Sequence, residues 1–546
     1  MQVIDQITRE IESVEGVRLL NVDPGKATNR TVVTFVGAPE PVIEAAYKAI
    51  RKAAELIDMR KHKGEHPRMG ATDVCPLIPI SGISMEETAG YARKLAKRVG
   101  EELQIPVYLY EAAAVIPGRT NLSEIRAGEY EGFFKKIHEP EWKPDFGPSL
   151  MNEKAGATVI GARDFLIAYN VNLNTTSVRR ANSIAFDVRE RGRVKRDGDP
   201  VTGKIVKDEQ GNPVHIPGSL KAVKAIGWFI EEYGVAQISM NLTNIRTTPV
   251  HIAFDEVCKK ADARGIRVTG SELVGLIPLQ CMLDAGRYFL EKQQRSTGVS
   301  EAELIKIAVK SMGLDELGPF EPEKRIIEYV LKEASQEKLV SMTLKGFMEE
   351  THSESPAPGG GSISAYVGAL GVALGGMVAN LSAHKRGWDA RWKEFSDVAE
   401  KAVVLEKELL RLVDEDTRAF NRIMDAFGLA NGSAEEKAIR KAAIQEATRK
   451  AIETPLQVMR LALESMEIVA QMAEFGNPNS VSDAGVGALC ARTAVLGAGL
   501  NVKINCAGYD DAAFVEQTLS EVQQLIARAN EREAEVLSIV ERVMAS

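Results

Sequence analysis

Residues 362–383 read SISAYVGALGVALGGMVANLSA and contain no charged side chain. The stretch is long enough to span a bilayer. Its composition argues against a membrane segment, because glycines, alanines and polar residues such as Ser364 and Asn380 make it only modestly apolar. Small residues instead let a helix lie close to its neighbours on every side. We therefore predict a helix buried in the core of a soluble helical bundle, without a membrane.

The patterns along the rest of the chain predict its domain organisation. From residue 339 onward, alanine-rich helical periodicity dominates, which predicts an all-α helical-bundle domain over 339–546. Residues 1–165 and 166–331 alternate strand and helix patterns, which predicts two α/β sandwich subdomains with mixed sheets, an α+β fold. Residues 332–338 are the predicted linker. Two capping-box sequences predict helix starts, SMEE at 84–87 and SAEE at 433–436.

Composition excludes several classes of protein. The 68 basic and 76 acidic residues give a net charge of -8, so we expect no general attraction to nucleic acid or anionic membranes. The five cysteines are odd in number and include no Cys-x-x-Cys pair, so neither a disulfide framework nor a zinc site is expected. The N-terminus lacks the pattern of a secretory signal. We predict a cytoplasmic protein.

The stretch HKGEHPRMG, residues 62–70, holds two of the seven histidines. Gly64 and Pro67 oppose helix, so the two rings cannot form a zinc-binding pair on successive helical turns. A loop with a titratable ring beside Glu65 and Arg68 is suited to acid/base chemistry next to an anion. The alternative is a histidine that only satisfies a hydrogen bond in a tight turn.

A second cluster of chemical groups lies in LVDEDTRAF, residues 412–420. Three adjacent carboxylates repel one another, which raises a pKa if one of them is buried. Helical spacing places Asp416 on the same face as Leu412, Val413, Ala419 and Phe420. A carboxylate on an apolar face needs a partner or a function, whereas most acidic runs form a solvated helix face.

The glycine-rich stretch PAPGGGS, residues 356–362, leads directly into the uncharged helix. The backbone amides at such a helix start and the helix dipole favour an anion or a carbonyl group. The alternative is the end of a flexible linker.

Taken together, these motifs resemble a known family. HKGEHPRMG, with DVCP at 73–76, resembles glutamate formimidoyltransferase, and PAPGGGS with LVDEDTRAF resembles formimidoyltetrahydrofolate cyclodeaminase. Both in this order resemble the bifunctional formimidoyltransferase-cyclodeaminase family. The resemblance implies transfer of the formimidoyl group from N-formimidoyl-L-glutamate to tetrahydrofolate in histidine breakdown. It also implies cyclisation to 5,10-methenyltetrahydrofolate with release of ammonia, polyglutamylated tetrahydrofolate as co-substrate, no metal, and a homo-oligomer.

The resemblance also implies roles for individual residues. His66 and Asp416 match the catalytic histidine and aspartate of the family. Asp23 follows a strand-like run and would orient the histidine or bind the amidinium, or else it is a turn aspartate. The implied substrate-binding residues are Asn29, Arg30, Arg68, Gly359, Gly360, Gly361, Ser362 and Asp483. The implied folate-binding residues are Gly147, Pro148, Ser149, Gly156, Ala157, Thr158 and Gly161.

The chain departs from the family at its start. The family opens with a strand that ends in Val-Pro-Asn-Phe-Ser-Glu-Gly, whereas this sequence begins inside the helix that follows. Three alternatives therefore stay open at this point: a cyclodeaminase alone, a transferase that uses formylglutamate, or a catalytically silent folate-binding scaffold.

Overall fold

The structure of the protein is a computed structural model. It describes residues 2–25, 29–63, 67–80, 82–198, 203–331 and 339–546. The chain forms two compact units: unit 1 comprises Met1–Cys281 and Met312–Leu331, and unit 2 comprises Met282–Ser311 and Lys332–Ser546. The predicted linker, residues 332–338, lies outside the described residues.

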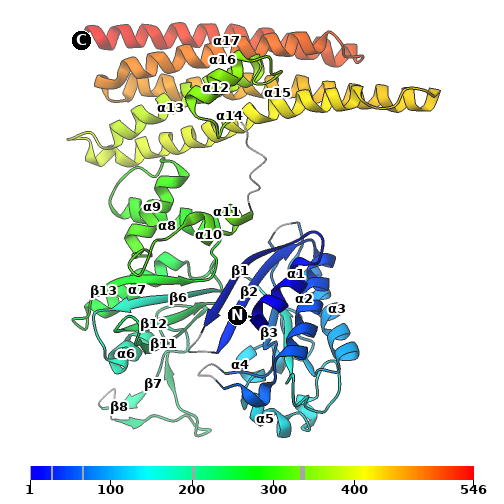
Figure 1. The fold of residues 1–546 in the computed structure, drawn as a ribbon. Coiled ribbons are helices and arrows are strands. Elements are labelled where there is room, and N and C mark those ends of the chain that lie inside the picture. The colour runs from blue at the N-terminus through cyan, green and yellow to red at the C-terminus, as the bar shows by residue number, and fades with distance from the viewer. Residues whose placement is uncertain (1, 26–28, 64–66, 81, 199–202, 332–338) are drawn as a thin grey trace. The chain divides into compact units, whose positions relative to one another are not determined.

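The first part of unit 1 combines a β-hairpin with a layered sheet and helices (Figure 1). Its main elements are α1 (Gln2–Glu12), β1 (Val17–Gly25), β2 (Arg30–Gly37), α2 (Pro39–Leu56), β3 (Val74–Leu77), α3 (Met85–Leu103), β4 (Val107–Glu111), α4 (Leu122–Ile125), α5 (Glu129–Lys136) and β5 (Thr158–Ala162). Strands β1 and β2 pair antiparallel, and β3, β5 and β4 form a parallel sheet in that order.

Both faces of the parallel sheet are covered by apolar side chains, as expected for parallel strands. On one face, Leu109 of β4 and Ile160 of β5 pack with residues of α2 and α3. On the other, Tyr108 and Val159 pack with Phe133 of α5. The sheet is therefore a buried support for the loops at its edges.

The second part of unit 1 is an antiparallel sheet in the order β11-β12-β6-β13, with α6 and α7 packed against it. Its elements are β6 (Ile167–Leu173), α6 (Val178–Val188), β7 (Arg193–Val194), β8 (Arg196–Asp197), β9 (Lys204–Ile205), β10 (His215–Ile216), β11 (Val223–Ile230), β12 (Val235–Leu242), α7 (Val250–Asp262), β13 (Val268–Val274), α10 (Pro322–Arg325) and α11 (Ile327–Leu331). Gly227 of β11 lies so close to α6 that a Cβ there would be 2.4 Å from the backbone nitrogen of Asn182.

Unit 2 is helical throughout its described part. Its elements are most of α8 (Leu279–Lys292), α9 (Glu301–Met312), α12 (Leu344–His352), α13 (Gly360–Ala383), α14 (Trp392–Phe427), α15 (Ala434–Phe475), α16 (Val481–Cys506) and α17 (Ala512–Ala545). The loop between α8 and α9 is tied to the bundle: Thr297 donates its backbone N–H to Ser396 of α14 at 3.0 Å, and Asn380 of α13 donates to the carbonyl oxygen of Gly298 at 2.8 Å.

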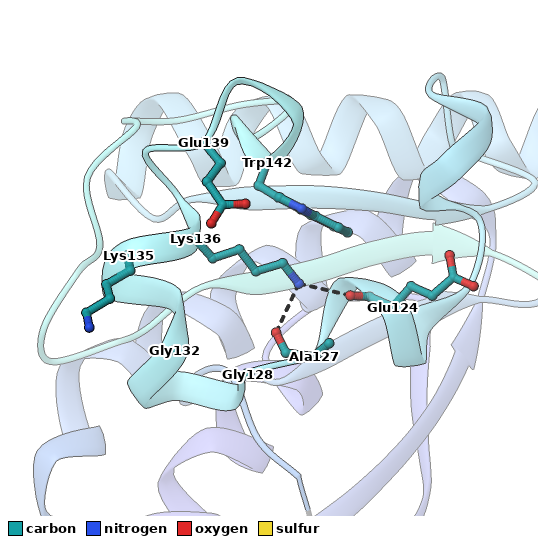
Figure 2. A pocket seen from close by; sticks show the side chains of 8 residues that line it. All are labelled: Glu124, Ala127, Gly128, Gly132, Lys135, Lys136, Glu139 and Trp142. Carbon is teal, nitrogen blue, oxygen red and sulfur yellow. Dashed lines mark hydrogen bonds between the residues drawn. The ribbon is translucent and has the colours of Figure 1, made fainter. Parts of the chain in front are cut away.

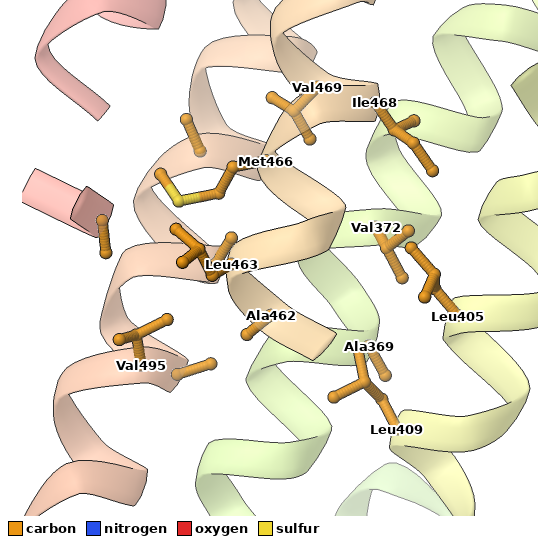
Figure 3. Close-up of a cluster of buried hydrophobic side chains, with 14 of the residues drawn as sticks. Ala369, Val372, Leu405, Leu409, Ala462, Leu463, Met466, Ile468, Val469 and Val495 are labelled. Atoms are coloured by element: carbon orange, nitrogen blue, oxygen red, sulfur yellow. The ribbon is translucent and has the colours of Figure 1, made fainter. Parts of the chain in front are cut away.

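Helix α13 lies in the core of this bundle, as its uncharged sequence predicts. Ala369 and Val372 of α13 pack with Leu409 of α14 and Val469 of α15 (Figure 3). A Cβ on Gly371 would lie 2.9 Å from the carbonyl oxygen of Gly487 in α16, so glycine permits this close approach. Among the described residues, α13 and the helix over Pro478–Cys506 are long and apolar enough to cross a membrane, and 61% and 50% of these apolar windows are buried in the structure.

The predicted fold class is confirmed. Parallel and antiparallel strands occupy the first part of the chain, and helices alone form the described part after residue 339. Both predicted capping boxes are also present, with Ser84 and Glu87 at the start of α3 and Ser433 and Glu436 at the start of α15.

Candidate active sites

The β1-β2 hairpin carries the first group of predicted site residues. Asp23 lies within β1 opposite Val32, and not at the strand end that the sequence suggests. Arg30 is the first residue of β2. Burial and the charge of Arg126 lower the pKa of Arg30, while Asp73 and Asp23 oppose this shift. Arg126, Asp73 and Asp23 therefore lie close enough to Arg30 to act on its charge.

Arg126 and Asp73 form a buried ion pair beside this hairpin. The guanidinium donates to Oδ2 of Asp73 at 2.5 Å, and the two side chains are only 12% and 13% exposed. Oδ1 of Asp73 accepts a hydrogen bond from the backbone N–H of Met69 at 2.9 Å. The pair thus fixes the end of the 62–70 stretch. Motif reasoning missed Arg126, because it lies far from the signature and no local pattern singles it out.

The 62–70 loop is fixed at both of its described ends. Asn29 has a left-handed backbone (φ 48°), and its side chain donates to the carbonyl oxygen of Lys63 at 2.8 Å. Arg68 donates to the carbonyl oxygen of His62 at 3.1 Å and pairs with Glu131 at 2.7 Å. Residues 64–66, including the predicted catalytic His66, lie outside the described residues.

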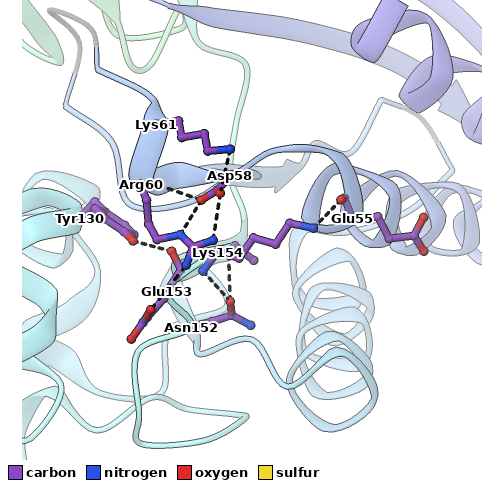
Figure 4. A network of polar contacts seen from close by, with 9 residues as sticks. Glu55, Asp58, Arg60, Lys61, Tyr130, Asn152, Glu153 and Lys154 are labelled. Atoms are coloured by element: carbon purple, nitrogen blue, oxygen red, sulfur yellow. Dashed lines mark hydrogen bonds and ion pairs between the residues drawn. The ribbon is translucent and has the colours of Figure 1, made fainter.

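A polar network holds the chain just before this loop (Figure 4). Arg60 donates to Asp58, which holds the pKa of that carboxyl at about 2. Lys154 donates its ammonium to the carbonyl oxygen of Glu55 at 2.6 Å, and its carbonyl oxygen accepts from Met59 N–H at 2.9 Å. The short helical turn at Met59–Lys61 is therefore anchored to the 152–155 segment, so the loop starts from a defined position.

A shallow pocket beside α4 and α5 is built around Lys136 (Figure 2). Its ammonium donates to the carbonyl oxygens of Glu124, Ile125 and Ala127 and lies 3.7 Å from the ring centre of Trp142. Burial lowers the pKa of this lysine to about 8. Because the three carbonyls flank Arg126, Lys136 fixes the segment that carries the arginine.

The predicted folate-binding stretches lie in two places. Gly156 pairs with Gly70, and a Cβ on Gly156 would lie 2.2 Å from the carbonyl oxygen of Met69, so this stretch borders the 62–70 loop. Ala157, Thr158 and Gly161 are buried in or beside β5. Gly147 (φ 84°) packs instead against Ile105, with Pro148 and Ser149 following it. The role of these residues in folate binding stays a prediction.

Asp416 is the centre of the second site, where α14 meets the first turn of α13. The Ser362 hydroxyl lies 3.1 Å from Oδ2 of Asp416 and 2.9 Å from the carbonyl oxygen of Val413. A Cβ on Gly361 would lie 2.2 Å from Oδ1 of Asp416, so glycine alone leaves room for the carboxylate. The structure therefore brings Gly361, Ser362 and Asp416 together, as the resemblance implies.

Burial raises the pKa of Asp416 above the ordinary carboxyl value, and hydrogen bonds from Ser362 partly oppose that rise. Repulsion by the neighbouring carboxylates is not the cause, contrary to our expectation. Asp414 faces the other way and accepts from Leu339 N–H at 2.9 Å, and Glu415 pairs with Arg418 and Arg422. A partly accessible carboxyl with a raised pKa is suited to proton donation near neutral pH.

The remaining residues predicted for this site do not all lie near Asp416. Gly359 caps α13 and Gly360 begins it. Asn501 of α16 lies next to Gly360, since a Cβ there would be 3.2 Å from its Nδ2. Asp483 lies eighteen residues earlier on α16, about 27 Å along the helix. Asp483 therefore does not join this cluster within one chain, whereas Asn501 lies beside it.

Comparison with known proteins covers both halves of the chain. Family models match three consecutive stretches: the "Formiminotransferase domain, N-terminal subdomain" over 1–163, the "Formiminotransferase domain" over 168–332 and "Formiminotransferase-cyclodeaminase" over 343–524. The chain is 42% identical to formimidoyltransferase-cyclodeaminase of Mus musculus over 541 residues, which are 99% of this chain and 96% of that protein. The chain belongs to the formimidoyltransferase-cyclodeaminase family.

Each half of this family member also resembles a separate protein. Glutamate formimidoyltransferase of Thermoplasma acidophilum is 43% identical over 290 residues, 53% of this chain and 87% of that protein. Methenyltetrahydrofolate cyclohydrolase of Methylorubrum extorquens is 40% identical over 193 residues, 35% of this chain and 93% of that protein. The two halves therefore have relatives that exist without the other half.

The transferase half of this family member contains one more polar cluster, of which the sequence motifs indicated Glu272 but not its partners. On β6, β12 and β13, Glu272 accepts from Asn170 at 3.1 Å, and Gln237 donates to Asn172 at 2.7 Å. Asn170, Asn172 and Gln237 are almost fully buried. The alternation of asparagines with apolar residues in β6 could have indicated this cluster, because residues two apart in a strand lie on the same face of the sheet.

Proposed function

We propose that the protein is a bifunctional folate enzyme of histidine degradation. It transfers the formimidoyl group from N-formimidoyl-L-glutamate to tetrahydrofolate and then cyclises 5-formimidoyltetrahydrofolate to 5,10-methenyltetrahydrofolate. The observation that carries the proposal is the match, over 99% of the chain, to a relative named formimidoyltransferase-cyclodeaminase. Two separate acid/base clusters, one in each half, support it.

In the transferase step, N5 of tetrahydrofolate attacks the amidine carbon of formimidoylglutamate. The bond from that carbon to the glutamate nitrogen then breaks, and the N5 proton passes to the departing amine. We assign this proton transfer to His66, since a histidine titrates near neutral pH without further tuning. Arg30 and Arg68 would bind the substrate carboxylates. Asp23, which acts electrostatically on Arg30, would orient the amidinium.

In the cyclodeaminase step, N10 attacks the same carbon and loses its proton. The carbon–nitrogen bond breaks, and the nitrogen leaves as ammonia after it has gained one further proton. Asp416 would donate that proton, and its raised pKa keeps more of the carboxyl protonated at neutral pH. The N-terminal amides of α13 would hold the substrate beside it.

We further propose that the folate carries a polyglutamate tail, which would keep the intermediate near the enzyme between steps. A homo-oligomer and a cytoplasmic location belong to the same proposal. The odd number and wide spacing of the five cysteines support a reducing compartment.

The two steps can be tested separately by the variants His66→Ala and Asp416→Asn. Glutamate release from formimidoylglutamate reports the first step, and ammonia release from 5-formimidoyltetrahydrofolate reports the second. Each variant is expected to lose at least about 100-fold in its own step and to keep the other. A wild-type protein that releases neither product would refute the function, and a variant at wild-type rate would refute its assignment. Formylglutamate, assayed in parallel, should be the poorer substrate.

A further inference from the structure

Asn501 and Asp416 lie on either side of the first two residues of α13. An ideal Cβ on Gly360 would be 3.2 Å from Nδ2 of Asn501, and one on Gly361 would be 2.2 Å from Oδ1 of Asp416. Gly360 is exposed, and Asn501 is partly exposed. A substrate that reaches Asp416 across this turn therefore meets the Asn501 amide as well.

The orientation of the Asn501 amide follows from its hydrogen bonds. Its Nδ2 donates to the carbonyl oxygen of Gly497 at 3.0 Å, one turn earlier in α16. A carbonyl can only accept, so one N–H of Nδ2 points at Gly497, and Oδ1 lies on the other branch of the amide, 3.6 Å from an ideal Cβ on Gly360. No described residue donates a hydrogen bond to Oδ1. Asn505, by contrast, donates across to Ala451 of α15 at 2.7 Å and serves to hold two helices together.

We propose that Oδ1 of Asn501 accepts a hydrogen bond from the formimidoyl N–H of the substrate and thereby selects this group over formyl. The inference rests on the proposed cyclodeaminase function. The formimidoyl nitrogen carries a hydrogen, whereas a formyl group presents an oxygen that can only accept. An acceptor at this point attracts the first group and repels the second. Asn501 takes no part in bond making, and it binds the nitrogen that Asp416 protonates.

The first test compares two ligands in the full-length protein. For Asn501→Ala, kcat/KM for ammonia release from 5-formimidoyltetrahydrofolate should fall about tenfold, which corresponds to one lost hydrogen bond of about 1.4 kcal/mol. Competitive inhibition of the same step by 5-formyltetrahydrofolate should stay within twofold or become tighter. A change of less than twofold in kcat/KM, or an equal weakening of both ligands, would overturn the inference.

Two controls separate a binding role from a fold defect. Asn530→Ala changes an exposed helical asparagine that only accepts from Arg492, and it should leave both constants unchanged. The transferase rate of each variant, measured on the same preparation, should equal that of the wild type. If the wild type releases no ammonia, the proposed function fails. If the wild type is active and Asn501→Ala releases ammonia at the same rate, only this inference fails.

A second variant tests the geometry directly. Asn501→Asp places a carboxylate near Asp416, and like charges make ionisation of Asp416 harder. The fall in cyclodeaminase rate with increasing pH should therefore shift to higher pH. An unshifted profile would mean that position 501 is too far from Asp416 to share a substrate group with it.

Discussion

The two candidate sites are built from opposite kinds of structure. The transferase cluster gathers Asp23, Arg30, Asp73 and Arg126 from a hairpin, loops and a short helix, whereas the Asp416 site is formed where long helices meet. The unperturbed pKa of a histidine side chain already lies near neutral pH, so the histidine proposed for the first site needs no pKa shift to transfer a proton. The ordinary pKa of an aspartate lies well below neutral pH, and burial in the tightly packed bundle raises the pKa of Asp416.

The largest expected effect concerns the packing around Asp416. In Gly361→Ala the new Cβ would displace the carboxylate, and the cyclodeaminase rate should fall about 100-fold, since a shift of about 1 Å has this effect on a reacting group. Transferase activity should not change. Gly508→Ala is the matched control, because its Cβ would meet no atom within 4 Å and the residue lies outside both candidate sites. Equal activity in both variants would show that the bundle does not position the acid.

The corresponding change in the loop-built site is Asp73→Ala. It leaves Arg126 buried without a counter-charge and should lower the free energy of unfolding of unit 1 by about 3 kcal/mol in chemical denaturation. It should also reduce transferase activity while the cyclodeaminase rate persists. Glu40→Ala, which breaks an ion pair with Lys94 at an exposed position, should change stability by less than about 1 kcal/mol.

Ser362→Ala should produce a smaller effect that appears in the pH profile. Hydrogen bonds from Ser362 favour the ionised form of Asp416, so loss of the hydroxyl should raise the pKa of Asp416 further. The acid works when protonated and activity is lost as pH rises through its pKa, so the alkaline limb of the cyclodeaminase profile should move to higher pH. Ser465→Ala, at a buried serine bonded only within α15, should leave the profile in place.

The smallest expected effects compare the two units through their helix caps. Ser84→Ala and Ser433→Ala each remove one capping box and should lower stability by about 1 kcal/mol. Ser84→Ala should lower the temperature at which transferase activity is lost. Ser433→Ala should lower the temperature at which cyclodeaminase activity is lost. Thermal inactivation of the two activities, followed in one sample, measures both. A common shift would show that the units unfold together.

Local signals predicted a large part of this molecule correctly. The lack of charge in residues 362–383 predicted a core helix, and the capping boxes of Ser84 and Ser433 predicted two helix starts. Helical periodicity placed Asp416 on the face of the buried Leu412, Val413 and Ala419, although Phe420 of the same face is exposed. These features depend on neighbours within about one turn of the chain, which is the range that sequence patterns describe.

The sequence by itself determined the fold class of the protein. It also determined that the motif with the histidines precedes the motif with Asp416. Only the tertiary structure decided that Arg126 neutralises Asp73, that Asn501 and not Asp483 lies beside Gly360, and that burial raises the pKa of Asp416. The reason is physical. Periodicity states which face of a helix is buried, whereas the partner it meets depends on how helices more than fifty residues apart pack against each other.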